Sequence, residues 1–259
     1  MARIIAVTNQ KGGVGKTTTS INLAASLAAT GRRVLLLDMD PQGNTTMGSG
    51  VDKNDLEFSV FDVLVGSAAI KEVMVNAEQS GYYIVPANGD LTAAEVHLLS
   101  MENKEHRLKN ALTLAKNEFD YIFIDCPPSL NMLSVNAMVA ADSLIIPMQC
   151  EYFALEGLSA LLSTIDQITE SHNPNLQIEG LVRTMYDPRN RLCTEVSAQL
   201  QEHFGDKVYR TPIPRNVRIA EAPSYGLPAM YYDKTSRGSR AYMALAEEVI
   251  KTELAREPA

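Results

Sequence analysis

The chain contains 259 residues, of which 46% are hydrophobic and 21% are charged, and its formal net charge is −8. This length and balance are typical of one large globular domain with a continuous core. No apolar run approaches the ~18 residues that a membrane-spanning helix needs, and three scattered cysteines argue against a disulfide or zinc framework. We therefore expect a cytoplasmic protein, and the acidic balance gives no overall sign of nucleic-acid binding.

The first strong pattern is a glycine-rich loop, QKGGVGKTT at residues 10–18, between an apolar run at 4–7 and a helix-like stretch at 19–28. In a strand–loop–helix context the glycines let successive backbone N–H groups point at one anion, and the helix N-terminus adds partial positive charge. The loop therefore predicts nucleotide binding, with Lys16 on the β- and γ-phosphates and the Thr17 hydroxyl on Mg²⁺.

This loop departs from the usual phosphate-binding pattern at its start. Gln10 stands where the pattern has a glycine, and an additional lysine, Lys11, precedes the glycine pair. The loop residues that we predict to bind the nucleotide are Lys11, Gly12, Gly13, Val14, Gly15, Lys16, Thr17 and Thr18.

Two later strands are predicted to end in carboxylates. Residues 33–38 and 121–125 are apolar throughout rather than alternating, which is typical of buried parallel strands, and they end at Asp38 and Asp125. Ligands of open parallel sheets bind at the carboxyl ends of the strands, and a carboxylate beside a phosphate loop commonly supports Mg²⁺. The metal site predicted from these residues consists of Thr17, Asp38 and Asp125.

The remaining pattern alternates expected strands with expected helices. Further strands are expected over 82–86, 143–148 and 176–182, and helices over 59–64, 70–74, 91–99, 108–115, 131–141, 155–169 and 240–254. This alternation implies right-handed crossovers between parallel strands. The predicted fold class is α/β: a single P-loop NTPase domain over residues 1–259, with a mostly parallel twisted sheet and helices on both faces.

The last third of the chain is locally basic. Residues 183–240 contain ten basic and six acidic residues, a local charge of +4 in a chain of −8, so the remainder carries −12. A basic face on an acidic protein can hold a polyanion, although solvated loop arginines give the same count. The polar loop at 213–218, which we expect to follow a short strand, is a plausible rim for a base pocket through Pro214, Arg215 and Asn216.

Taken together, residues 11–18, 38–44 and 125–128 resemble the deviant Walker A, A′ and B motifs of the ParA/MinD ATPases. Residues 151–157 and 213–224 resemble specifically the chromosomal ParA branch, also called Soj. The resemblance extends from the first expected strand to the last expected helix, with the motifs in the family's order.

The resemblance implies an ATP- and Mg²⁺-dependent homodimer that holds two nucleotides between its chains. Lys11 would reach the partner's nucleotide, Lys16 would act on its own nucleotide, and Asp40 would orient the attacking water. Phosphoryl transfer needs charge stabilisation and a positioned water more than a covalent catalyst, so these roles suit the chemistry.

The resemblance also implies a function in chromosome or plasmid partitioning. The ATP-bound dimer would bind double-stranded DNA non-specifically, through residues that include Arg189, Arg215 and Arg218. A ParB-type centromere-binding protein would stimulate slow hydrolysis and release the dimer. The implied location is the nucleoid within the cytoplasm, without membrane attachment.

Three other classes share the phosphate loop. Against a MinD-like membrane-associated positioning ATPase stand Gln10, where MinD has glycine, and the acidic last helix. A cluster-carrying ATPase of the nitrogenase iron-protein type needs suitably placed cysteines, which Cys126, Cys150 and Cys193 do not offer. A metabolic kinase would need an acceptor site, for which the sequence has no signature.

Overall fold

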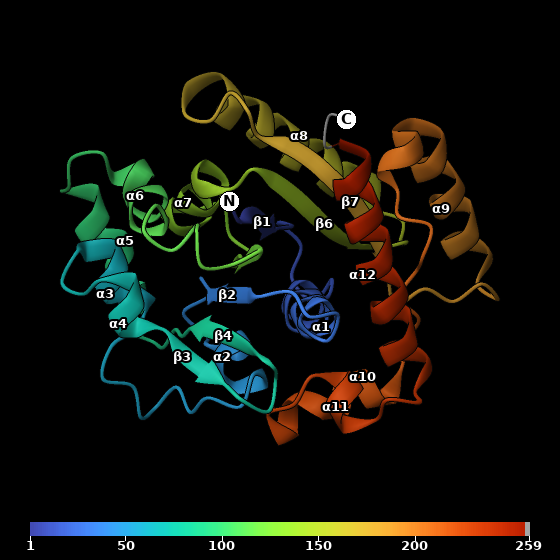
Figure 1. The fold of residues 1–259 in the computed structure, drawn as a ribbon. Coiled ribbons are helices and arrows are strands. Elements are labelled where there is room, and N and C mark those ends of the chain that lie inside the picture. The colour runs from blue at the N-terminus through green and yellow to red at the C-terminus, as the bar shows by residue number, and fades with distance from the viewer. Residues whose placement is uncertain (257–259) are drawn as a thin grey trace.

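The computed structural model describes the backbone of residues 1–256 and the side chains as far as residue 252. The predicted domain thus includes three residues, 257–259, that lie outside the described part of the chain. The strands found are β1 (Arg3–Val7), β2 (Val34–Asp38), β3 (Val75–Ala77), β4 (Tyr82–Val85), β5 (Tyr121–Asp125), β6 (Ser143–Gln149) and β7 (Gln177–Thr184). They form one sheet in the order β3-β4-β2-β5-β1-β6-β7 (Figure 1).

The sheet is parallel except at one edge, which confirms the predicted mostly parallel arrangement. Strands β1, β2, β4, β5, β6 and β7 pair in parallel with their neighbours, whereas β3 is antiparallel to β4. Strand β3 was not predicted; it has three residues, of which two are exposed. So short an edge strand carries too little periodicity to be recognised.

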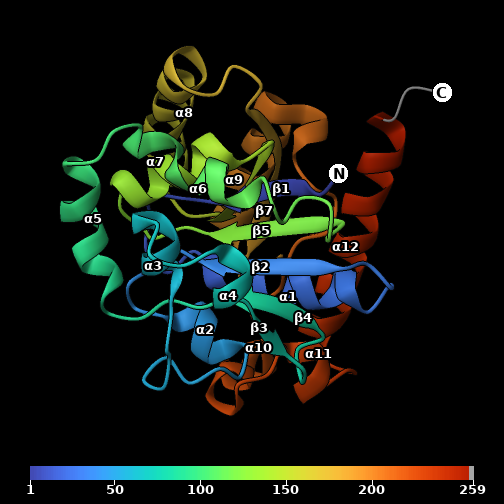
Figure 2. The same ribbon diagram turned by 60° about the vertical axis from the view of Figure 1, so that its left-hand side comes forward.

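Helices cover both faces of the sheet. They are α1 (Lys16–Ala28), α2 (Asn44–Gly48), α3 (Val60–Val65), α4 (Ile70–Val73), α5 (Leu91–Leu99), α6 (Arg107–Leu112), α7 (Met132–Ala140), α8 (Ala154–Ser171), α9 (Arg191–Phe204), α10 (Val217–Glu221), α11 (Ala229–Tyr232) and α12 (Arg237–Arg256), with 3₁₀ turns η1 (Lys104–His106), η2 (Gly205–Lys207) and η3 (Ala222–Tyr225). Helices α1 and α12 pack together on one face, while α3, α5, α6 and α7 cover the other (Figure 2).

The two faces explain why the central strands are apolar throughout. Leu35 and Leu37 of β2 belong to the core under α3 and α5, and Leu36 between them belongs to the core under α1 and α12. Successive side chains of a strand point to opposite faces, so a strand covered on both sides needs apolar residues at every position.

Several details of the last third differ from the prediction, including the short helices α10 and α11, for which no helix was predicted. Helix α9 occupies residues for which no helix was predicted, although Cys193, Val196 and Leu200 are buried at helical spacing. The short strand expected before the loop at 213–218 is absent from the described chain, where Pro214 forms only an isolated bridge with Tyr186. This bridge and a second one, between Leu181 and Val208, position the segment without extending the sheet.

Candidate nucleotide-binding site

The predicted phosphate loop lies between β1 and α1, at the carboxyl edge of the sheet. Gly15 is the N-cap of α1 with φ +89°, and Gly13 has φ +72°. Residues with a side chain rarely adopt this left-handed region, so the loop needs glycine at both positions to turn into the helix. The free N–H groups of the first turn of α1 therefore face the loop, as an anion site requires.

Lys16, the first residue of α1, is 7% exposed and lies beside the buried acids of the site. Its Nζ donates to the Lys11 carbonyl oxygen at 3.2 Å. Burial lowers the pKa of the Lys16 ammonium, while Asp125 and Asp40 act in the opposite direction. A bound polyphosphate would supply the negative charge that this partly desolvated cation lacks.

Asp38 and Asp125 are brought together, as the sequence predicted. They are register partners at the carboxyl ends of the neighbouring strands β2 and β5, and both are fully buried. Asp125 accepts hydrogen bonds from Thr17 Oγ1 at 2.8 Å, Ser20 Oγ at 2.8 Å and Thr45 Oγ1 at 2.5 Å. The predicted metal residues Thr17, Asp38 and Asp125 thus form one cluster of hard oxygen atoms, the ligand type that Mg²⁺ prefers.

Asp38 is held in the loop that follows β2. Thr46 donates to its Oδ2 from both the backbone N and Oγ1, each at 2.8 Å, and the backbone N of Asp40 donates to Oδ1 at 3.1 Å. Burial raises the pKa of Asp38 to about 7, and the nearby charge of Asp125 adds to the effect. Burial also raises the pKa of Asp125.

We expect this raised pKa to make the stability of the metal-free chain depend on pH. Because Asp38 titrates at about 7 when folded and at about 4 when unfolded, the folded state binds the proton more tightly. Its stabilising contribution is fully present below about pH 4 and is lost as the pH rises through about 7. The free energy of unfolding of Asp38→Asn, relative to the wild type, should therefore rise across this window in urea titrations with EDTA.

The matched control is Asp120→Asn, because hydrogen bonds from Arg33 lower the pKa of Asp120. That carboxylate stabilises the fold above its unfolded pKa, so its relative effect should change in the opposite direction as the pH falls. A difference between the wild type and Asp38→Asn that is constant from pH 4 to 8 would contradict the raised pKa of Asp38.

The side chain of Lys11 is exposed, unlike that of Lys16. Its ammonium lies outside the loop and forms an ion pair with Glu151, with 2.6 Å between Nζ and Oε2 and side-chain exposures of 42% and 51%. In the single chain the additional lysine is therefore paired within its own subunit, at the surface beside the phosphate loop. Its predicted contact with a partner's nucleotide stays a prediction.

Asp40 occupies the turn between β2 and α2. Its Oδ1 accepts from the backbone N of Gln42 at 2.9 Å, and its side chain contributes to the charge that Lys16 experiences. The geometry places this carboxylate near the phosphate loop, but its role in orienting water is still a prediction.

Several residues that hold the loop were not predicted. Gln149 Nε2 donates to the Gly13 carbonyl oxygen at 3.2 Å, and Thr184 Oγ1 donates to the Val14 carbonyl oxygen at 2.7 Å. These side chains come from the ends of β6 and β7, and only the sheet order brings them to the loop. Thr45 and Thr46 could have been predicted as site residues, because they directly follow the Asp38–Asn44 motif.

The segment predicted to form a base pocket contacts the chain just after β7, whose last residue, Thr184, binds the phosphate loop. Tyr186, two residues after Thr184, donates its backbone N–H to the Ile213 carbonyl oxygen at 2.9 Å. Asn216 then caps α10, since its Oδ1 accepts from the backbone N of Ile219 at 3.2 Å. The predicted pocket residues Pro214, Arg215 and Asn216 directly follow Ile213, which contacts the chain just after Thr184. Their binding of adenine stays a prediction.

Of the three arginines predicted to bind DNA, Arg189 and Arg215 lie in loops and Arg218 lies in α10, and two of the three are paired with acids. Arg189 donates to both oxygens of Asp187, at 2.9 and 2.8 Å, and Arg215 is close enough to help lower the pKa of that carboxyl group to about 2. Arg218 pairs with Glu221 at 2.8 Å.

The count of basic residues needs one correction. Arg183 is 5% exposed and donates to Ser197 Oγ at 2.9 Å and to the Tyr209 carbonyl oxygen at 2.8 Å. It is a buried cross-link between β7 and the following segments, so it does not belong to a basic surface.

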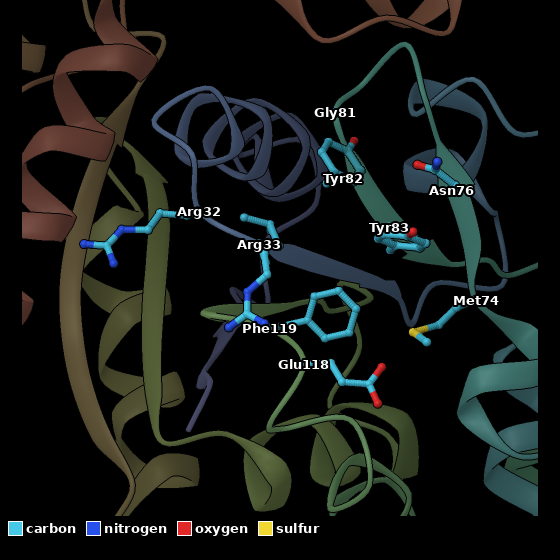
Figure 3. Close-up of a pocket in the computed structure, with 10 residues that line it drawn as sticks. Arg32, Arg33, Met74, Asn76, Gly81, Tyr82, Tyr83, Glu118 and Phe119 are labelled. Carbon is cyan, nitrogen blue, oxygen red and sulfur yellow. The ribbon is translucent and has the colours of Figure 1, made fainter.

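A separate pocket of about 430 Å³ opens at the other end of the strands (Figure 3). Its lining includes Arg33, Met74, Asn76, Tyr83 and Phe119, and the rings of Tyr83 and Phe119 meet edge to face. Because β2 begins beside this pocket and ends at Asp38, the pocket and the phosphate loop lie at opposite edges of the sheet.

Two other kinds of site have no counterpart in the described residues. Among them no group of three or more His, Cys, Asp or Glu side chains is placed to hold a metal ion. None of the helices up to residue 256 combines the length and hydropathy that crossing a bilayer requires.

The strand–loop–helix geometry and the paired strand-end carboxylates define a P-loop nucleotide-binding protein. Residues 2–178 match the model of a family described as "AAA domain". The chain is 50% identical to the chromosome partitioning protein ParA of Caulobacter vibrioides, over 98% of this chain and 96% of the relative. It is 51% identical to the sporulation initiation inhibitor protein Soj of Bacillus subtilis, over 96% and 98%.

A solved structure also matches along the whole chain. Cobyrinic acid a,c-diamide synthase from Mycobacterium smegmatis, with bound ATP analogue and magnesium, superposes with a TM-score of 0.87 at 36% identity, over 98% of this chain and 97% of that one. The chain therefore belongs to the ParA/Soj family of P-loop ATPases, as its motifs predicted.

Proposed function

We propose that this chain is an ATP-dependent DNA-segregation ATPase that acts in chromosome or plasmid partitioning. The observation that carries the proposal is the position of Lys11. An ordinary phosphate loop does not need this lysine, and its ammonium lies at the surface beside the loop, 42% exposed. A cation in that position suits a nucleotide shared between two chains, because dimer formation would bring it to the partner's phosphates.

The surroundings of the other site residues support the roles proposed for them. Lys16 and the N–H groups at the start of α1 bind the phosphates of ATP, while Thr17, Asp38 and Asp125 offer the oxygen atoms for Mg²⁺. When bound, Mg²⁺ neutralises charge on the β- and γ-phosphates. Asp40 orients the attacking water, and Lys11 of the partner would stabilise the charge that develops during transfer.

DNA binding by the ATP dimer rests on electrostatics. Arg189, Arg215 and Arg218 come from the loops after β7 and at the start of α10, and dimerisation doubles their number on one assembly. A ParB-type protein then stimulates slow hydrolysis, and the dimer dissociates from DNA. The name of the ParA relative, a chromosome partitioning protein, supports the partitioning function proposed here.

Gel filtration of the wild type tests the proposal directly. We expect a monomer without nucleotide, a dimer with ATP and Mg²⁺, and co-elution with a short DNA duplex only in the presence of ATP. A chain that stays monomeric with ATP, or that ignores duplex DNA, would defeat the proposal. Strong ATP-dependent co-sedimentation with lipid vesicles would instead favour a MinD-like membrane-associated positioning ATPase.

We also expect Arg189→Glu to weaken DNA binding while leaving ATP affinity unchanged. The substitution places a carboxylate beside Asp187, so attraction to the phosphates is replaced by repulsion. Because each proposed dimer loses one cation per chain, the slope of log affinity against log salt should be reduced by about two. Fluorescence anisotropy of a labelled duplex, measured with ATP at several salt concentrations, gives both quantities.

The matched control for this prediction is Lys71→Glu. Lys71 is likewise an exposed, ion-paired cation, but its partner is Glu118, beside the pocket at the opposite edge of the sheet. Both variants change the net charge equally and break one surface pair. An equal loss of DNA affinity in the two variants would show a general charge effect and would exclude a specific contact by Arg189.

A further inference from the structure

Helix α2 is attached to the two buried carboxylates of the site. It begins after the loop that ends β2, and Thr46 within it donates to Asp38 from both the backbone N and Oγ1 at 2.8 Å. Its neighbour Thr45 donates to Asp125 Oδ2 at 2.5 Å. Helix α2 cannot move as a unit without changing hydrogen bonds at the base of the site.

The same oxygen of Asp125 also accepts from the phosphate loop. Thr17 Oγ1 and Thr45 Oγ1 both donate to Asp125 Oδ2. A cation that uses the Thr17 hydroxyl or this carboxylate must redirect at least one of the two donors. Binding of a cation at the site would therefore change the hydrogen bonds that hold α2.

The other end of α2 meets η3 through two glycines. A Cβ on Gly50, which has φ +84°, would lie 2.9 Å from the Gly226 carbonyl oxygen, and a Cβ on Gly226 would lie 2.8 Å from Gly50 Cα. The two backbones thus touch without any intervening side chain, and α2 and η3 lie next to each other. If either backbone is displaced toward this contact, the other must also move, because close-packed atoms leave no free space to absorb the displacement.

The segment on the far side of this contact carries the basic residues. Turn η3 continues directly from α10, and Gly226 is its C-cap. Arg218 lies in α10 and pairs with Glu221 at 2.8 Å and with Asp233 at 3.5 Å. A shift at Gly226 therefore moves the short helix that positions Arg218.

A second connection runs through one buried amide. Asn22 on α1 is 5% exposed, its Nδ2 donates to the Thr18 carbonyl oxygen at 2.8 Å, and its Oδ1 accepts from the backbone N of Ala229 at 2.7 Å. Thr18 ends the phosphate loop, and Ala229 begins α11. Since Thr18 and Asn22 both lie in α1, the Asn22 side chain joins the first turn of α1, where the phosphate loop ends, to the segment that follows η3.

We propose that the Gly50–Gly226 contact and the Asn22 bridge couple the nucleotide site to the basic segment, so that nucleotide occupancy sets the position of Arg218 and the affinity for DNA phosphates. Asn22, Gly50 and Gly226 act as positioning residues. The coupling rests on the proposed function, because it concerns the same DNA-binding segment.

Gly50→Ala and Gly31→Ala form a matched test pair. Gly31 has φ +86°, close to that of Gly50, but no atom lies within 4 Å of a Cβ built there. Both variants bear the same backbone strain, and only Gly50→Ala forces α2 and η3 apart. We expect the ratio of duplex affinities with and without ATP to fall by about tenfold or more in Gly50→Ala, a usual size for coupling between sites, and to persist in Gly31→Ala.

Asn22→Ala tests the second connection with Asn173→Ala as its control. Asn173 is also 5% exposed, and its Nδ2 donates to the Met138 and Ala141 carbonyl oxygens at 3.0 and 2.7 Å, away from the nucleotide site. Both variants should lose stability in urea titrations. Only Asn22→Ala should also lose ATP-dependent DNA affinity and, reciprocally, the gain in ATP affinity that duplex DNA produces.

Different results would overturn the proposed function and the proposed coupling. A wild type whose DNA affinity does not respond to ATP defeats the proposed function itself. A wild type that responds, together with Gly50→Ala and Asn22→Ala variants that fold and keep the full response, overturns the coupling and leaves the proposed function intact.

Discussion

Replacing Lys16 with alanine is expected to lower the affinity for ATP by about 100-fold or more, a loss of roughly 3 kcal/mol that is typical of a charge-assisted contact in a partly buried site. Lys16 is 7% exposed, and burial lowers the pKa of its ammonium. Its favourable interaction with phosphates is therefore screened little by water. Isothermal titration calorimetry with ATP and Mg²⁺ measures the loss.

The folded state should survive this substitution. The hydrogen bond that Lys16 Nζ donates to the Lys11 carbonyl oxygen is a weak one of 3.2 Å, and the Gly15 cap and the apolar face of α1 stay in place. Lys71→Ala serves as a control for the loss of a lysine remote from the loop. Unaltered ATP affinity in folded Lys16→Ala protein would overturn the assignment of the phosphate loop.

The core of the site could be predicted from the sequence because its parts follow local rules. Continuous apolar runs identified β2 and β5 as buried parallel strands, and such strands align their carboxyl ends. The prediction that Asp38 and Asp125 lie together is confirmed by their register. The glycine-rich loop was equally local, since strand, turn and helix are consecutive.

Contacts that depend on sheet order could not be predicted in this way. Gln149 and Thr184 reach the loop from β6 and β7, and nothing in the spacing of the chain states that these strands follow β1 in the sheet. The missed helix α9 has another cause. Its buried residues Cys193, Val196 and Leu200 show helical spacing, but this stretch was interpreted by its charges instead.

A count of charged residues in a sequence also does not show which of them form ion pairs. The predicted basic segment includes Arg189, but its charge is offset within two residues by Asp187, and Arg218 is paired with Glu221 in the same helix. A polyanion must therefore compete with local carboxylates for these arginines. Ion pairs between exposed side chains are weak because water and salt screen them, so DNA phosphates can displace them, and affinity should fall as salt rises.

Asp40→Ala is expected to bind ATP with nearly unchanged affinity and to hydrolyse it about 100- to 10,000-fold more slowly, the range that loss of a general base or water-orienting group produces. The carboxylate lies near Lys16 and the loop, but the groups that we propose to bind the phosphates are others. Single-turnover phosphate release measures the chemical step. Gel filtration should show a persistent dimer that stays on DNA, because hydrolysis is the event that we propose ends the dimer.

Asp40→Asn separates charge from shape in this prediction. Asp40 Oδ1 accepts from the backbone N of Gln42 at 2.9 Å, so alanine also removes a contact that shapes the turn before α2. Asparagine keeps an oxygen acceptor there and removes only the negative charge. Equal inactivity of both variants would assign the effect to the carboxylate charge, whereas an active asparagine variant would assign it to the turn. Normal turnover in Asp40→Ala would remove Asp40 from the mechanism and leave the orientation of the attacking water to another group of the dimer.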